Sequence, residues 1–156
     1  MEKESRMIGI DGIKKLLPHR PPLLLVDRVL DYSLGESIQA VKNTSISEPV
    51  FEGHFPGNPV FPGVYMLEGL AQTSAVLSFL MAIEKYGEES IDKTCFLTGV
   101  QSSRFKRLVV PGDVIHYHVD VTRIRGLFAW FKGTAKVDGE LAAEAEFSAR
   151  LGQPII

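Results

Sequence analysis

The stretch "GVYMLEGLAQTSAVLSFLMAIEKY", residues 63–86, decides the fold of this chain. Apolar or small residues lie on nearly every face of the helix that it predicts, whereas a surface helix carries a single apolar stripe. Pro62 precedes the stretch, and proline suits a helix start because its missing N–H would have no partner there. Gly87 is a typical helix stop. The sequence therefore predicts one long helix that is buried on most of its sides.

Patterns typical of β-strands flank this helix on both sides. In residues 113–124, apolar and polar side chains alternate with period two. Asp138-Gly139 is a strong two-residue hairpin signal between two further strands. A short helix is expected at 8–17, and strands are expected at 23–32, 36–45, 93–105, 113–124, 127–137 and 140–150. These elements predict an α+β fold in which an antiparallel sheet of about six strands wraps the helix. Residues 1–156 are expected to form a single domain, with 1–7 as a flexible tail.

Composition and charge narrow the classes of function. The chain has 156 residues, of which 45% are hydrophobic and 23% charged, as is ordinary for a globular domain. A net charge of -2 gives no overall drive toward nucleic acid or membranes. The opening "MEKESRM" lacks an apolar segment, and one cysteine excludes an internal disulfide and suits a reducing compartment. We therefore expect a cytoplasmic protein that binds neither nucleic acid nor membrane.

A lone carboxylate, Glu68, interrupts the apolar helix. Lys and Arg are absent from the positions one helical turn away, 64, 65, 71 and 72, so burial is expected to raise the pKa of Glu68. A glutamic acid that is still protonated near neutral pH can act as a general acid. Gln72 lies at i+4 on the same face and could hydrogen-bond and orient the acid.

A histidine, His54, lies in the loop "GHFPGNP", residues 53–59, shortly before the helix. Histidine is largely neutral at pH 7 and can accept a proton. The backbone N–H groups of Gly63 and Val64, at the helix start, could stabilise a carbonyl oxygen that gains negative charge. A base, an acid and such donors fit the dehydration of a β-hydroxy carbonyl compound. From spacing alone, a structural loop histidine and a solvated or interface acid remain open readings.

The segment "GHFPGNPVFPGVYMLEGLAQ" resembles the active-site segment of FabZ-type β-hydroxyacyl-acyl carrier protein dehydratases of type II fatty acid synthesis. "LLPHRPPLLLVDRV" (16–29) and "RFKRLVVPGD" (104–113) match flanking motifs of that family in the same order, so the resemblance covers about residues 8–150. It implies a hotdog fold, with His54 and Glu68 as catalytic residues and the Gly63 N–H as a donor to the thioester carbonyl. It also implies dimers whose sites take the histidine and the glutamate from different subunits, assembled as a trimer of dimers, a homohexamer.

The implied activity is the dehydration of (3R)-hydroxyacyl-acyl carrier protein to trans-2-enoyl-acyl carrier protein in fatty acid biosynthesis. The carrier protein would bring the acyl chain on its phosphopantetheine arm, and no metal or redox cofactor is expected, since no electrons leave the substrate. FabA-type relatives have Asp at the Glu68 position, which favours a plain dehydratase here. Gly69 stands where many relatives have Ala. The alternatives are a hotdog enoyl-CoA hydratase, an acyl thioesterase and a non-catalytic acyl-binding module.

Other residues are weaker candidates. Aromatic residues that could line a substrate tunnel are Phe55, Phe61, Tyr65 and Phe96. Basic residues that could dock an acidic carrier protein are Arg104, Lys106 and Arg107, with Arg123 and Arg125 as weaker candidates. His116 and His118 are expected to be exposed strand residues and His19 to be structural. The absence of GxGxxG and Walker-type loops predicts no nucleotide cofactor.

Overall fold

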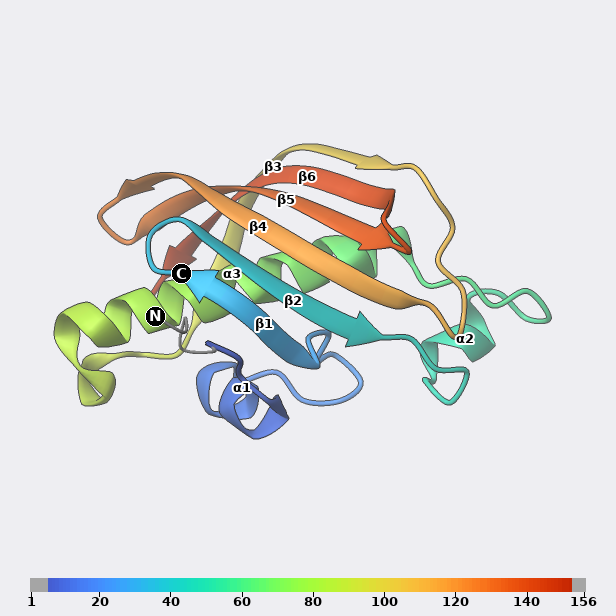
Figure 1. Cartoon of the computed structure of the whole chain (residues 1–156), viewed down its shortest axis with the longest axis horizontal. Coiled ribbons are helices and arrows are strands. Elements are labelled where there is room, and N and C mark those ends of the chain that lie inside the picture. The colour runs from blue at the N-terminus through green and yellow to red at the C-terminus, as the bar shows by residue number, and fades with distance from the viewer. Residues whose placement is uncertain (1–5, 153–156) are drawn as a thin grey trace, which may run out of the picture.

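The computed structural model describes residues 6–152, in which an antiparallel sheet curves around one long helix (Figure 1). That helix, α3, runs from Gly63 to Tyr86, as the sequence predicts. The other helices are α1 (Ile10–Leu16), α2 (Val50–Gly53) and the short 3-10 helix η1 (Glu88–Ser90). The strands are β1 (Arg28–Ser33), β2 (Ser37–Asn43), β3 (Cys95–Phe105), β4 (Val114–Arg125), β5 (Phe128–Val137) and β6 (Glu140–Leu151).

The six strands form one sheet in the order β1-β2-β4-β5-β6-β3, and every neighbouring pair is antiparallel. The predicted meander of the last three strands is confirmed. Asp138 and Gly139 join β5 and β6 with φ values of 50° and 76°, which suit a tight hairpin turn. Strand β3 follows the central helix in sequence but pairs with β6, so it forms one edge of the sheet.

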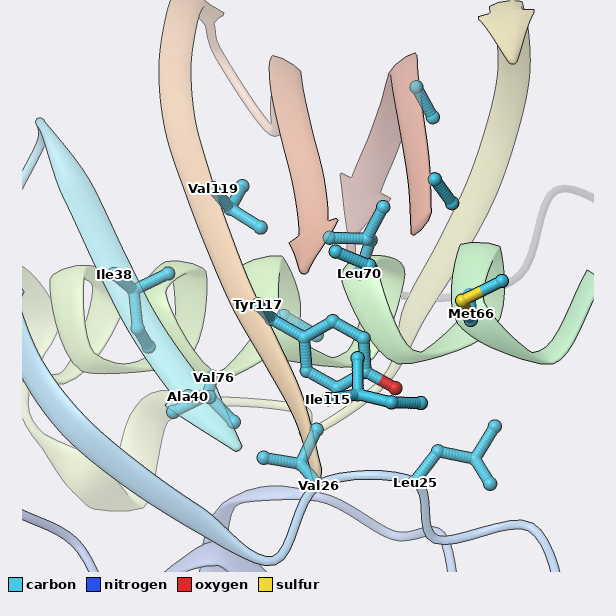
Figure 2. Packing of buried hydrophobic residues seen from close by; sticks show 14 of the residues in the cluster. Leu25, Val26, Ile38, Ala40, Met66, Leu70, Val76, Ile115, Tyr117 and Val119 are labelled. Atoms are coloured by element: carbon cyan, nitrogen blue, oxygen red, sulfur yellow. The ribbon is translucent and has the colours of Figure 1, made fainter. Parts of the chain in front are cut away.

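The core lies between α3 and the concave face of the sheet, where Tyr117 of β4 packs beside Leu70 and Met66 of α3 (Figure 2). The alternation in β4 is confirmed, because Ile115, Tyr117 and Val119 are buried. A methyl group added at Gly69 would collide with the Tyr117 ring and hydroxyl. The missing side chain at Gly69 therefore makes room for a bulky tyrosine beneath the helix.

The prediction for residues 23–32 is wrong in its first half, because β1 begins only at Arg28. The carbonyl of Leu23 and the N–H of Leu25 bond instead to the side chain of Gln72, which replaces strand pairing there. The sequence reading also did not predict α2 and η1. Most of the predicted flexible tail, residues 1–7, lies outside the described residues, although Arg6 donates a hydrogen bond to the carbonyl of Tyr32.

Helix α3 is long and apolar enough to cross a membrane by length and composition. However, 61% of its most apolar window is buried against the rest of the chain. The sheet and the flanking segments therefore supply the apolar surroundings that this composition requires, and α3 is the core helix of the fold.

Candidate active site

His54 lies directly after α2 and is held by the loop that leads to α3. Its Nδ1 lies 2.7 Å from the carbonyl oxygen of Val60, and the Val60 N–H donates back to the His54 carbonyl at 2.9 Å. A carbonyl can only accept, so Nδ1 carries the proton and Nε2 of the neutral ring keeps its lone pair. The ring of Phe55 stacks on His54 with the centroids 3.9 Å apart. This arrangement gives His54 the tautomer and the fixed orientation that a base needs.

A buried ion pair supports the segment before His54. Lys42 of β2 is only 4% exposed, and its ammonium lies 2.8 Å from Oε1 of Glu48 and 2.9 Å from the Asn43 carbonyl. The other oxygen of Glu48 accepts from the Ser45 N–H. Phe61 then anchors the far end of the loop, because it is buried and its N–H donates to the Val109 carbonyl at 2.7 Å. The loop that carries His54 is thus fixed by the Lys42–Glu48 ion pair before it and by Phe61 after it.

The start of α3 offers backbone donors. Within the described residues, the N–H groups of Gly63 and Val64 have no hydrogen-bond acceptor, whereas that of Tyr65 donates to the Pro62 carbonyl. A side chain at position 63 would come within 2.8 Å of the Phe105 ring, so Gly63 allows β3 to pass close to the helix start. Two free N–H groups at a helix N-terminus can bind a partially negative oxygen.

Glu68 lies one helical turn before Gln72, which is almost fully buried and fully hydrogen-bonded. The Gln72 carbonyl accepts from the Leu25 N–H at 2.8 Å, so its amino group must face the other way. That group donates to the Leu23 carbonyl at 2.7 Å and to Oε1 of Glu68 at 2.9 Å. The i+4 contact that the sequence suggested is present, and it is fixed to the chain before β1.

The prediction of a raised pKa for Glu68 is wrong for this chain. Burial raises the pKa, but hydrogen bonding to His19 and Gln72 and the charge of His19 together outweigh burial, so the pKa lies below its ordinary value. His19 Nε2 lies 3.5 Å from Oε1 of Glu68. The neighbouring positions on α3 carry no cation, whereas this partner comes from the loop after α1. His19, expected to be structural, is therefore the site residue that the sequence reading missed, although the quoted motif at 16–29 contains it.

The charge of Glu68 also reaches two groups on the sheet. Burial, aided by this charge, raises the pKa of the Cys95 thiol to about 11. Burial raises the pKa of Tyr117 well above its usual range, with smaller contributions from Asp27, Glu48 and Glu68. Both groups are therefore neutral at physiological pH.

His54 and Glu68 do not meet within one chain in a direct contact. In the part of the chain that the structure describes, no hydrogen bond, ion pair or ring contact joins the two side chains. Each is instead fixed by its own neighbours, His54 by Val60 and Glu68 by Gln72 and His19.

A cavity of about 450 Å³ lies beside the C-terminal half of α3. It is lined mostly by apolar side chains of α3 and the sheet, including Met81, Ala82, Cys95 and Phe131. The four aromatic tunnel candidates lie elsewhere: Phe61 is buried, Tyr65 packs edge-on against it, and Phe55 and Phe96 are exposed. This apolar cavity is thus lined by other residues than these four aromatic side chains.

The basic candidates differ in their contacts. Arg107 donates to the Val137 carbonyl and pairs with Glu140 at 3.1 Å, so its guanidinium is engaged within the chain. Arg104 and Lys106 are exposed near the end of β3, and Arg123 lies over the Trp130 ring. Of the two strand histidines, His116 is exposed and His118 pairs with Asp120 at 3.0 Å. Among the described residues, no group of three or more His, Cys, Asp or Glu could hold a metal ion.

Comparisons with known proteins point to one family. The FabA-like domain matches residues 17–146. The chain is 48% identical over 145 residues to "3-hydroxyacyl-[acyl-carrier-protein] dehydratase FabZ" of a Nitratiruptor species, covering 93% of this chain and 98% of the relative. It is 47% identical to the protein of the same name from an Anaeromyxobacter species (strain K), covering 93% and 91%.

Solved structures share the fold at low sequence identity. The dehydratase heterocomplex ApeI:P from Xenorhabdus doucetiae matches with a TM-score of 0.76 at 18% identity, covering 90% of this chain and 91% of that one. A hypothetical thioesterase with coenzyme A from Streptococcus pneumoniae TIGR4 matches with a TM-score of 0.59 at 10% identity, covering 80% and 84%. These likenesses and the sheet around α3 confirm the hotdog fold. By its domain match and its near full-length relatives, the chain belongs to the FabZ-type family of 3-hydroxyacyl-acyl carrier protein dehydratases.

Proposed function

We propose that this chain dehydrates (3R)-hydroxyacyl-acyl carrier protein to trans-2-enoyl-acyl carrier protein in fatty acid biosynthesis, in the cytoplasm. The observation that carries the proposal is the fixed tautomer of His54, whose Nδ1 is bound to the Val60 carbonyl and whose Nε2 is left free to take a proton. The near full-length identity to relatives named as FabZ dehydratases supports the substrate class.

Each group of the site has its own step in the proposed reaction. Nε2 of His54 removes the α-proton, and the electrons of that C–H bond form the new double bond. Glu68, which its lowered pKa leaves mostly ionised near pH 7, takes up a proton before turnover and gives it to the β-hydroxyl, which leaves as water, while Gln72 holds the carboxyl in place. The free N–H groups of Gly63 and Val64 bind the thioester oxygen as it gains negative charge. No electrons are gained or lost overall, so side-chain acid–base chemistry suffices.

The site is completed by a second copy of the chain. Strand β3 is an edge of the sheet, and Phe96, Leu97, Val100 and Phe105 are exposed along it. An edge strand with exposed apolar side chains is suited to pairing with another chain. Such a homodimer would bring His54 of one subunit to Glu68 of the other, and three dimers would form the hexamer that the family resemblance implies.

An acyl carrier protein is the proposed macromolecular partner. Arg104 and Lys106 are exposed near the end of β3, beside Phe105, which lies against the helix start at Gly63. They could therefore pair with acidic groups of a carrier protein while its arm enters the site. Arg107 is less suited to this role because Glu140 and the Val137 carbonyl already engage it.

Incubation with crotonyl and 3-hydroxybutyryl thioesters tests the proposed chemistry against its alternatives. Interconversion of the two thioesters, followed by enoyl absorbance, is the expected result. Release of free thiol would instead identify a thioesterase, and binding without turnover would identify an acyl-binding module. Equal or better turnover of CoA thioesters than of carrier-bound ones would favour the enoyl-CoA hydratase.

The cavity beside α3 predicts a test of chain length. Ala82 lines this cavity and lies fourteen residues after Glu68, on the same helix face and about 21 Å further along the axis. Only a long acyl chain could reach it, so Ala82→Phe should lower kcat/KM for 3-hydroxyhexadecanoyl substrates roughly 10-fold, the effect of losing about one buried apolar contact. Turnover of 3-hydroxybutyryl substrates should not change.

Glu84→Phe is the matched control, because it adds the same ring to an exposed position of the same helical turn that does not line the cavity. Its ratio of long-chain to short-chain turnover should equal that of the unmodified chain. If Ala82→Phe also keeps the ratio of long-chain to short-chain turnover of the unmodified chain, the acyl chain does not enter this cavity.

A further inference from the structure

The carboxyl group of Glu68 is held by one of its two oxygens. Gln72 donates to Oε1 at 2.9 Å, and His19 Nε2 approaches the same oxygen at 3.5 Å. Within the described residues, Oε2 of Glu68 has no hydrogen-bond or ion-pair partner. The two oxygens are therefore not equivalent, since one faces protein donors and the other is free.

The surroundings of the other ring nitrogen of His19, Nδ1, determine which nitrogen carries the proton. Nδ1 is buried and lacks a hydrogen-bond partner in the described part of the chain. A proton on Nδ1 would place a buried N–H without an acceptor, which is costly. A neutral ring therefore favours its proton on Nε2, and a charged ring carries a proton there as well, so in both states an Nε2–H points at Oε1 of Glu68.

We propose that His19 is a positioning residue for Glu68: together with Gln72 it donates to Oε1, so that Oε2 carries the proton that leaves with the β-hydroxyl. This inference rests on the dehydratase function proposed above. In the step itself, the proton on Oε2 passes to the hydroxyl oxygen, the C–O bond breaks with its electron pair, and water departs. His54 holds the α-proton, which returns to Glu68 through solvent before the next turnover.

The two donors assist this step because they hold Oε1 and so fix the direction of Oε2, the oxygen through which the proton passes. Burial raises the pKa of Glu68, but the hydrogen bonds to His19 and Gln72 and the charge of His19 hold it below its ordinary value, so the carboxyl takes up its proton before each turnover. The other titratable groups that feel the charge of Glu68 are Cys95 of β3 and Tyr117 of β4, and both are neutral at pH 7. His19 is thus the neighbour whose removal should change the acidity of Glu68 most directly.

The test compares His19→Ala, His19→Gln and Arg20→Ala in the full-length protein. Loss of the donor in His19→Ala should raise the Glu68 pKa, measured by carboxyl-carbon NMR titration, and lower kcat roughly 10- to 100-fold with little change in KM. His19→Gln keeps an N–H donor and should restore most of both values. Arg20→Ala is the matched control, because Arg20 holds the same segment through the carbonyls of Leu17, His19 and Lys14.

A purely structural role for His19 predicts different results. Both His19→Ala and Arg20→Ala would then lose thermal stability, while the Glu68 pKa would stay at its wild-type value, and that result would overturn the proposal. If His19→Ala does not fold, nitrogen NMR of the unmodified protein decides, since a neutral His19 ring protonated on Nδ1 also excludes the proposal. These NMR readouts do not depend on turnover. Absence of turnover by the unmodified chain would therefore count against the dehydratase function alone.

Discussion

His54→Ala and Glu68→Gln are each expected to lower kcat for 3-hydroxyacyl thioesters by at least about 100-fold, because each removes one partner of the proton transfer. Alanine cannot take the α-proton that Nε2 of His54 is oriented to accept. Glutamine keeps the shape of Glu68 and its contact with Gln72 but has no acidic proton to donate. Steady-state kinetics with a short-chain substrate measures both losses.

Matched substitutions on the same elements serve as controls. His116→Ala removes an exposed histidine of β4, and Glu84→Gln neutralises an exposed carboxylate of α3, so both should keep wild-type activity. Mixing the inactive His54 and Glu68 variants tests the shared site, since each mixed dimer would regain one intact pair. Absence of activity after proven subunit exchange would show that each site takes both residues from a single chain.

Gly69→Ala is expected to destabilise the protein, although alanine is the better helix former. The added methyl group would collide with the Tyr117 ring, which is fully buried between α3 and β4. Overpacking of this kind costs about 1–3 kcal/mol, whereas the gain in helix propensity is at most about 1 kcal/mol. We expect a net loss of about 1 kcal/mol, or roughly 2–4 °C in Tm by thermal unfolding.

A double-mutant cycle identifies the cause of that loss. Tyr117→Val shortens the opposing side chain, so the loss in the double variant should be smaller than the sum of the single losses by at least about 1 kcal/mol. Gly9→Ala is the control, because no atom lies within 4 Å of its added methyl group. Strict additivity of the Gly69 and Tyr117 substitutions would contradict the clash.

The sequence predicts best those features that are local or periodic. The bounds of α3 follow from its apolar composition between Pro62 and Gly87, and the β5–β6 hairpin follows from Asp138-Gly139. The contact of Glu68 with Gln72 follows from helical spacing. Each of these needs only residues that are close in the chain.

Contacts between distant segments were not predictable in the same way. His19 reaches Glu68 from the loop after α1, and its approach reverses the direction expected for the Glu68 pKa. Leu23 and Leu25 have the apolar pattern of a strand, yet their backbone groups bond to a side chain of α3. The residues along α3 therefore do not reveal partners that only the folded chain brings near.

The hydrogen bond from the Leu25 N–H to Gln72 has a practical consequence. Gln72 holds Glu68 with the same amide group, so a rotation of the Gln72 side chain that releases the carboxyl also frees this backbone N–H to solvent. The deuterium exchange rate of the Leu25 amide should therefore rise when Gln72 is displaced, and it can be measured without substrate or an activity assay. The exchange rate of this one amide, far from Glu68 in the sequence, would thus report how often Gln72 leaves the position from which it holds the acid.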